Sequence, residues 1–170
     1  MNTFWRKVVV TGTLGVGLVL GFSLARVAAA TPALAVADLD YIDTSGEVRD
    51  QTTDHARRLK DFAGSLRTYL AGSGKFRVIA LDCHAGACSA GTDPDDVIAA
   101  AQKAGAAYVL FGGVHKQSTL LQWAKVEIVN VETKKVVFDR LLTFRGDDDL
   151  AWQRAETFLE RQLSEQTTIQ

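Results

Sequence analysis

Three strand-like segments follow one another in the second half of the chain, and they limit the folds that it can form. The first, 106–114 (AAYVLFGGV), is apolar throughout, which indicates a strand buried on both faces of a sheet. The next two, 120–131 and 135–145, are longer, and charged and apolar residues alternate around Lys125. Such alternation is typical of antiparallel strands with one face toward water. The sequence therefore predicts a β-hairpin beside a central strand.

Two glycines and two shorter apolar runs add detail to this sheet. Gly112 and Gly113, inside the central run, indicate a β-bulge or the close approach of another backbone. The runs at 33–41 and 76–81 come earlier in the chain and are expected to be strands of the same sheet.

The longest helix is expected between the first two strands. From about Thr53 to Leu70, apolar residues recur every three or four positions, which predicts a helix with one buried face. Arg57 and Arg58 fall mostly off this stripe, so we expect both on the solvated face. Gly72 gives a stop signal for the helix.

Two more helices complete the order of elements. Thr92 or Asp93 before a proline is a start signal for a helix over 95–104, and apolar spacing predicts a last helix over 150–163. The order is β-α-β-α-β-β-β-α. The predicted fold class is α/β (α+β), with a single mixed sheet and helices packed on it, in one globular domain over residues 31–170.

The first 30 residues have the layout of a secretory signal peptide. Arg6 and Lys7 form a positive start, 8–24 is an apolar run, and the small residues at 28–30 suit cleavage after Ala30. The alternative is a retained membrane anchor, although the run is near the lower length limit for spanning a bilayer. We expect a periplasmic or secreted protein that contacts the membrane only through this segment, if it is uncleaved.

The charge of the remaining chain excludes one class of partner. After the first 30 residues there are 16 basic and 20 acidic side chains, a net charge of −4. A domain that binds nucleic acid is normally basic, so nucleic acid is not an expected partner. Hydrophobic residues make up 47% and charged residues 23% of the chain, which is ordinary globular composition.

Two cysteines lie close together after the second predicted strand. Cys83 and Cys88 flank a segment with His84 and Gly86, and in an oxidising compartment a disulfide is the default. Closing so short a loop would contribute about 2 kcal/mol, as a local staple. The alternatives are a copper or zinc site formed by Cys83, His84 and Cys88, or a redox-active pair. No other feature of the sequence indicates a cofactor.

Several segments together form a familiar pattern. They are 43–47 (DTSGE), the central run 106–114, Lys116 with Ser118, 130–133 (NVET) and the R-G-D-x-D-x-x-W-x-R stretch of 145–154. With them, the chain resembles a bacterial exported family described as a domain of unknown function. More distantly, its order of elements is similar to the N-terminal domain of TolB and to CsgG-like envelope proteins. Those distant relatives are binding and assembly modules, not enzymes. The resemblance implies a periplasmic fold, but it assigns no activity.

Three acids stand in a row before the last helix. Asp147, Asp148 and Asp149 are suitable residues for a cation site or an acid–base pair. The simpler interpretation is helix capping, in which Asp148 or Asp149 accepts hydrogen bonds from free backbone N–H groups. The other acids would then complement the positive end of the helix.

Polar and aromatic residues near the strand ends provide further candidates. Arg145, over the indole of Trp152 or paired with one of the acids, would lock the last helix to the last strand. Lys116 and Ser118 stand in the expected loop, which is either a binding rim or a solvated hairpin loop. The binding candidates are Lys116, Ser118, Arg145, Asp147, Asp149 and Trp152.

The sequence contains no recognisable catalytic constellation. It has no G-x-S-x-G motif, and its three histidines are scattered outside any zinc motif. We therefore expect a non-catalytic envelope accessory module that binds another cell-envelope protein through a sheet edge or the loop 116–119. The alternative function is a metal or small-ligand carrier that uses Cys83, His84 and Cys88. An enzyme would need an arrangement that the sequence does not reveal.

Overall fold

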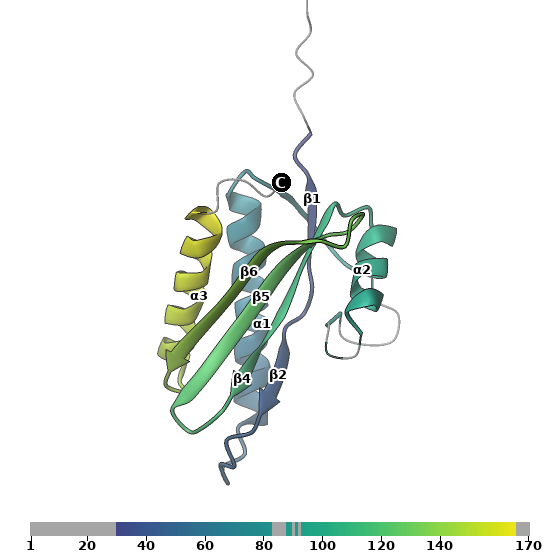
Figure 1. Cartoon of the computed structure of the whole chain (residues 1–170). Coiled ribbons are helices and arrows are strands. Elements are labelled where there is room, and N and C mark those ends of the chain that lie inside the picture. Colours follow the sequence, from purple (N-terminus) through teal and green to yellow (C-terminus); the bar gives the residue numbers. More distant parts are fainter. Residues whose placement is uncertain (1–29, 83–87, 90, 92, 166–170) are drawn as a thin grey trace, which may run out of the picture.

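The computed structural model describes residues 30–82, 88–89, 91 and 93–165. Within these residues the elements are, in order, β1 (Ala33–Val36), β2 (Asp40–Asp43), α1 (Thr52–Gly72), β3 (Arg77–Ile79), α2 (Pro94–Lys103), β4 (Tyr108–Lys116), β5 (Leu121–Asn130), β6 (Val136–Arg145) and α3 (Asp149–Glu165). The strands form one mixed sheet with helices packed on it, which confirms the predicted fold class (Figure 1).

The sheet combines parallel and antiparallel pairs. Its strand order is β3-β1-β4-β5-β6, and β2 also pairs with β4. β1 is parallel to β3 and β4, whereas β4, β5 and β6 pair antiparallel. The predicted hairpin and the predicted central strand are therefore confirmed.

The first predicted strand is divided in two, which corrects the predicted order to β-β-α-β-α-β-β-β-α. Val36 pairs with Leu110, and Asp40 pairs with Gly113. The three residues between β1 and β2 (37–39) therefore lie opposite two residues of β4 (111–112). Between them, the backbone N–H of Asp38 leaves the sheet and donates to the carbonyl of Cys88 at 2.7 Å. The strand divides because its polar middle residue bonds to another loop.

The two faces of the sheet bury separate groups of apolar residues. α1 and α3 lie side by side over one face, where Phe62, Trp152 and Leu159 belong to the larger core. α2 packs over part of the other face, where Val97 and Val109 belong to a smaller core (Figure 1). Because α2 is short, it leaves much of this second face without a helix over it.

Gly112 lies where the backbone of β5 leaves no room for a side chain on β4. A Cβ atom added at Gly112 would lie 2.1 Å from the backbone carbonyl oxygen of Lys125. This confirms the predicted close backbone approach. A register shift occurs elsewhere in the sheet, at Ile128/Val129 in the pairing of β5 with β6.

The predicted helix starts are capped as expected. Asp93 precedes Pro94, and its side chain accepts from the backbone N–H of Asp95. Asp148 accepts from the backbone N–H of Ala151 at 2.8 Å, so it caps α3. Across the described part of the chain, the helices lack the combination of length and hydrophobicity needed to cross a membrane. The predicted leader lies outside the described residues.

Glu156 is a residue of α3 that faces α1, and its carboxyl group is partly buried there. Burial, together with the charges of Glu160 and Asp61, raises the pKa of Glu156 to about 7. In the unfolded chain this group titrates near 4.5, so the folded state loses stability as the pH rises from 4.5 through 7. Glu156→Gln removes the buried negative charge. We expect it to raise the melting temperature at pH 8 by a few degrees, equivalent to about 1 kcal/mol.

The pH dependence separates this effect from a general change in packing. At about pH 4 the wild-type carboxyl is neutral, so Glu156→Gln should have the same melting temperature as the wild type at that pH. The exposed Glu132→Gln is the matched control and should behave as the wild type at both values. An equal gain at both pH values would show that the charge of Glu156 is not responsible.

Candidate functional site

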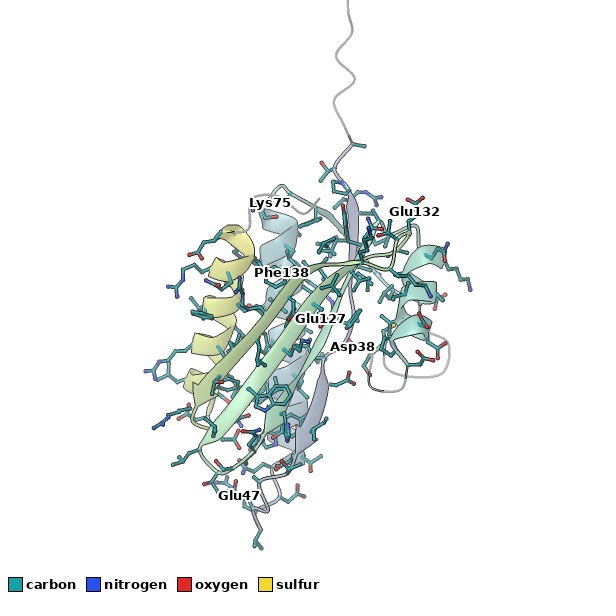
Figure 2. All side chains as sticks on the ribbon, viewed as in Figure 1. Asp38, Glu47, Lys75, Glu127, Glu132 and Phe138 are labelled. Carbon is teal, nitrogen blue, oxygen red and sulfur yellow. The ribbon has the colours of Figure 1, made fainter. Side chains whose placement is uncertain are left out.

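A cluster of charged side chains lies buried at one end of the sheet. Lys116, the last residue of β4, has no exposed surface. Its ammonium donates to Glu47 Oε2 at 2.6 Å and to Asp147 Oδ2 at 2.5 Å. Glu47 follows β2 in the chain. It lies at the opposite end of the sheet from Glu132, which is a residue of the turn between β5 and β6 (Figure 2). The cluster therefore joins the chain after β2, the end of β4 and the start of α3.

Helix α1 supplies two further members of this cluster. His55 Nε2 lies 2.9 Å from Asp147 Oδ1, and Arg58 donates to the same oxygen at 3.2 Å. Both side chains are buried, and the ring of Tyr41 stacks on His55. We name Glu47, His55, Arg58, Lys116 and Asp147 the Asp147 cluster.

Two neutral side chains complete the environment of Asp147. Gln122 donates to Asp147 Oδ1 at 3.3 Å and to the carbonyl oxygen of Gly146 at 2.7 Å. The indole N–H of Trp152 points to Asp147 Oδ1 at 3.4 Å, which is a long contact. Donors from two strands, β4 and β5, and two helices, α1 and α3, thus converge on one carboxylate.

The charges of the cluster support one another. Burial by itself would raise the pKa of Asp147, but hydrogen bonds from Lys116 and His55 outweigh it and hold this pKa below its usual value. Burial likewise opposes the charge of Lys116, but Asp147 and Glu47 together raise its pKa. Both groups are therefore charged at neutral pH, and each depends on the other for compensation.

The three consecutive acids have three different roles. Asp148 is the helix cap that the sequence predicts, whereas Asp147 is buried in the cluster. Asp149 is exposed and accepts from Arg57 at 2.6 Å and from Arg58 at 2.8 Å. The acids do not form a cation site: among the described residues, no group of three or more acidic, histidine or cysteine side chains could hold a metal ion.

The structure corrects the expected places of three basic residues. Lys116 is a buried strand residue and does not lie on an exposed loop rim; Ser118 does lie in the short loop after β4. Arg145 is exposed, and no contact is found for its side chain with Trp152 or with the three acids. The ion pairs that tie the start of α3 to its neighbours come from Arg58, which is buried although we expected it on a solvated face, and from Arg57, which is exposed as expected.

The Asp147 cluster has the character of a structural lock. The hydrogen bonds of His55 Nε2 are to Asp147, not to a serine, threonine or cysteine nucleophile of the described chain. A hydroxyl–imidazole pair does occur elsewhere, where Thr44 Oγ1 lies 2.7 Å from His115 Nε2 on the surface. His115 also makes an edge contact with Trp123, and the structure gives it no acidic partner among the described residues.

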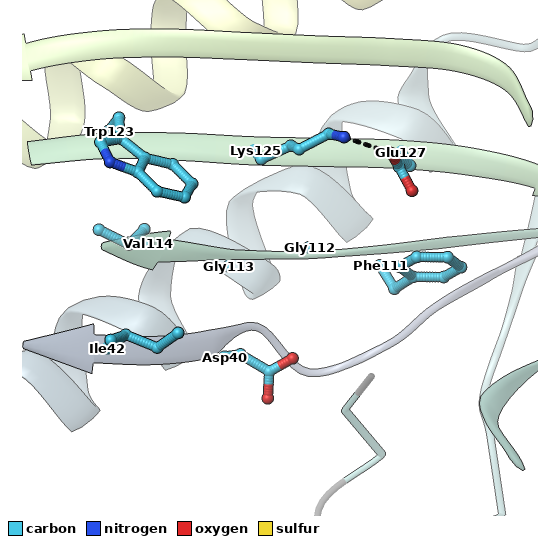
Figure 3. Close-up of a pocket in the computed structure, with 9 residues that line it drawn as sticks. All are labelled: Asp40, Ile42, Phe111, Gly112, Gly113, Val114, Trp123, Lys125 and Glu127. Carbon is cyan, nitrogen blue, oxygen red and sulfur yellow. Dashed lines mark ion pairs between the residues drawn. The ribbon is translucent and has the colours of Figure 1, made fainter. Parts of the chain in front are cut away.

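The uncovered sheet face contains a shallow pocket of about 260 Å³ above Gly112 and Gly113. Figure 3 shows the pocket between β2 and β5, with Ile42 and Trp123 at one end and Phe111 at the other. Ile42 is 56% exposed and lies next to the other apolar residues of the pocket.

Charged groups line the rest of this pocket. Lys125 and Glu127 on β5 pair at 2.6 Å, and Asp40 lies across from them on β2 (Figure 3). Gly113 brings no side chain into the pocket, and a Cβ there would lie 2.8 Å from the backbone oxygen of Asp40. We name Ile42, Phe111, Gly113, Trp123 and Lys125 the open-face pocket.

The predicted cysteine site is described only in part. Cys88 is not a free thiol, and its backbone N–H donates to Asp38 Oδ2 at 3.2 Å. Cys83 and His84 lie outside the described residues. The Cys83–Cys88 pair therefore stays a prediction, as does the weaker metal alternative.

Fold and site together define a small α+β domain whose buried polar groups are largely paired with one another. The chain belongs to the DUF3280 family, whose model carries the description "Protein of unknown function (DUF2380)" and matches residues 32–163. This agrees with the resemblance noted in the sequence. No curated protein sequence matches the chain.

Solved structures of similar fold include proteins named PelC, TolB and LpoB. PelC from Paraburkholderia phytofirmans, a dodecamer, is 17% identical, with a TM-score of 0.50 over 79% of this chain and 86% of PelC. TolB from Acinetobacter baumannii is 16% identical, with a TM-score of 0.50 over 79% of this chain and 28% of TolB. The C-terminal domain of LpoB from Salmonella enterica is 17% identical, with a TM-score of 0.46 over 70% of this chain and 86% of that domain. At these identities the likeness concerns the fold.

Proposed function

We propose that this chain is a non-catalytic accessory module of the cell envelope that binds another envelope protein through the open-face pocket. One observation carries the proposal: an apolar pocket with exposed Ile42 and half-buried Trp123 lies on the part of the sheet face that α2 leaves open in the described structure. Tryptophan in a pocket with a charged rim is a common anchor of protein interfaces.

The chemistry of the pocket specifies what the partner presents. Its volume of about 260 Å³ suits one or two side chains, and its floor is bare because Gly113 has no side chain. Lys125, Glu127 and Asp40 supply both signs of charge at the rim. The expected partner therefore inserts an apolar or aromatic side chain flanked by polar groups.

The leader and the cysteines support a proposal for the compartment in which the chain works. We infer that residues 1–30 direct export and that the chain works in the periplasm or outside the cell, where Cys83 and Cys88 form a disulfide. The likeness to TolB supports the fold class of this domain.

Self-assembly is the second candidate function. PelC, which has this fold, is a dodecamer, so a second copy of this chain is an alternative occupant of the pocket. The experiment below separates a second copy from a different protein by the mass of the product.

Site-specific photo-cross-linking in living cells tests the proposal. A photoreactive amino acid replaces Ile42, and in a control strain it replaces Leu150 on α3, which is exposed to nearly the same extent, 53% against 56%. We expect illumination to give one discrete product with a second protein at position 42, identified by mass spectrometry, and none at 150. Equal products at both positions, or none at either, would contradict the proposal. A product of twice the chain mass would instead support self-assembly.

A further inference from the structure

A second groove lies on the other side of the sheet, between its β6 edge and helix α3. Its volume is about 490 Å³. Five consecutive residues of β6, 140–144, line one wall, and Arg154, Phe158 and Gln162 of α3 are on the other. Successive side chains of a strand point to opposite faces, so five consecutive residues line one groove only where it follows the edge of the strand.

The backbone along this edge is available for pairing. In the described part of the sheet β6 pairs with β5 on one side and is the terminal strand on the other. A terminal strand presents a row of free N–H and C=O groups, which a segment from another chain can pair with. With ten residues, β6 is long enough for several such hydrogen bonds.

The groove is also positively charged. Arg140 and Arg154 line it, and no aspartate or glutamate is among its lining residues. Arg140 Nε is buried and has no hydrogen-bond partner, an arrangement that costs free energy unless a ligand supplies an acceptor. Arg161 adds a third cation beside it, over the ring of Phe158 at 5.2 Å.

The acidic residues in the middle of α3 lie on the side of the helix that faces away from the groove. Glu156 and Glu160 face α1, where Glu160 accepts from Ser65 at 2.9 Å. The acids of the helix middle therefore stand away from the groove, and its arginines stand toward it.

We propose that β6 accepts an acidic, extended segment of a partner protein as an additional strand, with carboxylates of that segment paired to Arg140 and Arg154. Backbone pairing along β6 supplies affinity, and bidentate arginine–carboxylate contacts select acidic sequences. This surface is separate from the open-face pocket, so the two proposals can fail independently.

Peptide binding to the purified protein tests this inference. The probe is a short fluorescent peptide in which glutamate alternates with valine, and the matched control replaces each glutamate with lysine. We expect the acidic peptide to bind and the basic one not to bind. Methylation of alternate backbone nitrogens of the acidic peptide should abolish binding in one of the two possible patterns, because only one set of N–H groups faces β6.

Variants assign the binding to the groove. Arg140→Gln with Arg154→Gln should weaken binding of the acidic peptide at least about tenfold. Arg77→Gln is the control, because Arg77 is an exposed arginine on β3 at the opposite edge of the sheet. Circular dichroism checks that the variants remain folded.

Three results would overturn the inference. The first is the absence of binding by the acidic peptide, and the second is an equal loss in Arg77→Gln. The third is arginine-dependent binding to phosphatidylglycerol vesicles without binding to the peptide or to phosphatidylcholine vesicles. That last result would assign the groove to anionic lipid.

Discussion

Replacing Asp147 with asparagine is expected to lower the free energy of unfolding by about 3–5 kcal/mol. Asparagine keeps the shape of the side chain but removes the charge that compensates Lys116, which has no exposed surface. It also removes the charge-assisted bonds to His55 and Arg58. Breaking a buried ion pair is costly because the remaining charge stays buried without full compensation.

Urea unfolding of matched variants measures this effect. Asp149 stands two residues away and also pairs with Arg58, but it is exposed, so Asp149→Asn should cost no more than about 1 kcal/mol. The midpoint of Asp147→Asn should shift strongly while the slope of the transition stays unchanged. Similar midpoints for the two variants would show that the Asp147 cluster does not lock the fold.

Replacing Gly112 with alanine is the second substitution for which we expect a large loss, about 3 kcal/mol. The new Cβ would lie 2.1 Å from the carbonyl oxygen of Lys125 and 2.9 Å from the Cα of Val126. These are backbone atoms in the centre of the sheet, so relief requires β4 and β5 to separate. The same displacement would distort the open-face pocket.

Gly64 is the matched control for this glycine. It lies within α1 and has no atom within 4 Å of an added Cβ. Because alanine favours helix more than glycine does, Gly64→Ala should stabilise the protein by about 0.5–1 kcal/mol. Thermal unfolding should therefore move in opposite directions for the two variants. A loss in both would point to a general intolerance of side chains at glycine positions.

The elements of the fold were largely predictable from local patterns. The alternation around Lys125 gave the hairpin, and the cap before Pro94 gave the start of α2, because each signal lies within a few residues of the structure that it specifies. The division of the first strand was missed. Its cause is the bond between Asp38 and Cys88, 50 residues apart, which no local pattern contains.

The Asp147 cluster was not predicted because its members are distant in sequence. His55 and Asp147 are separated by 92 residues. A signal was nevertheless present: His55, Arg58 and Phe62 follow the spacing of the buried stripe of α1. Extending the central strand by two residues would likewise have placed Lys116 on the same face as Val114. The predicted stripe was counted from apolar residues alone, so Arg58 fell off it and was assigned to the solvated face.

Trp123→Ala, combined with the photoreactive probe at position 42, tests most directly whether the open-face pocket binds a partner. Trp123 is half-buried and lies outside the Asp147 cluster, so the variant should stay folded with a loss of about 1–2 kcal/mol. We expect the yield of the cross-linked product to fall at least about tenfold, as for an anchor residue. A folded Trp123→Ala variant that gives the product in wild-type yield would contradict this account.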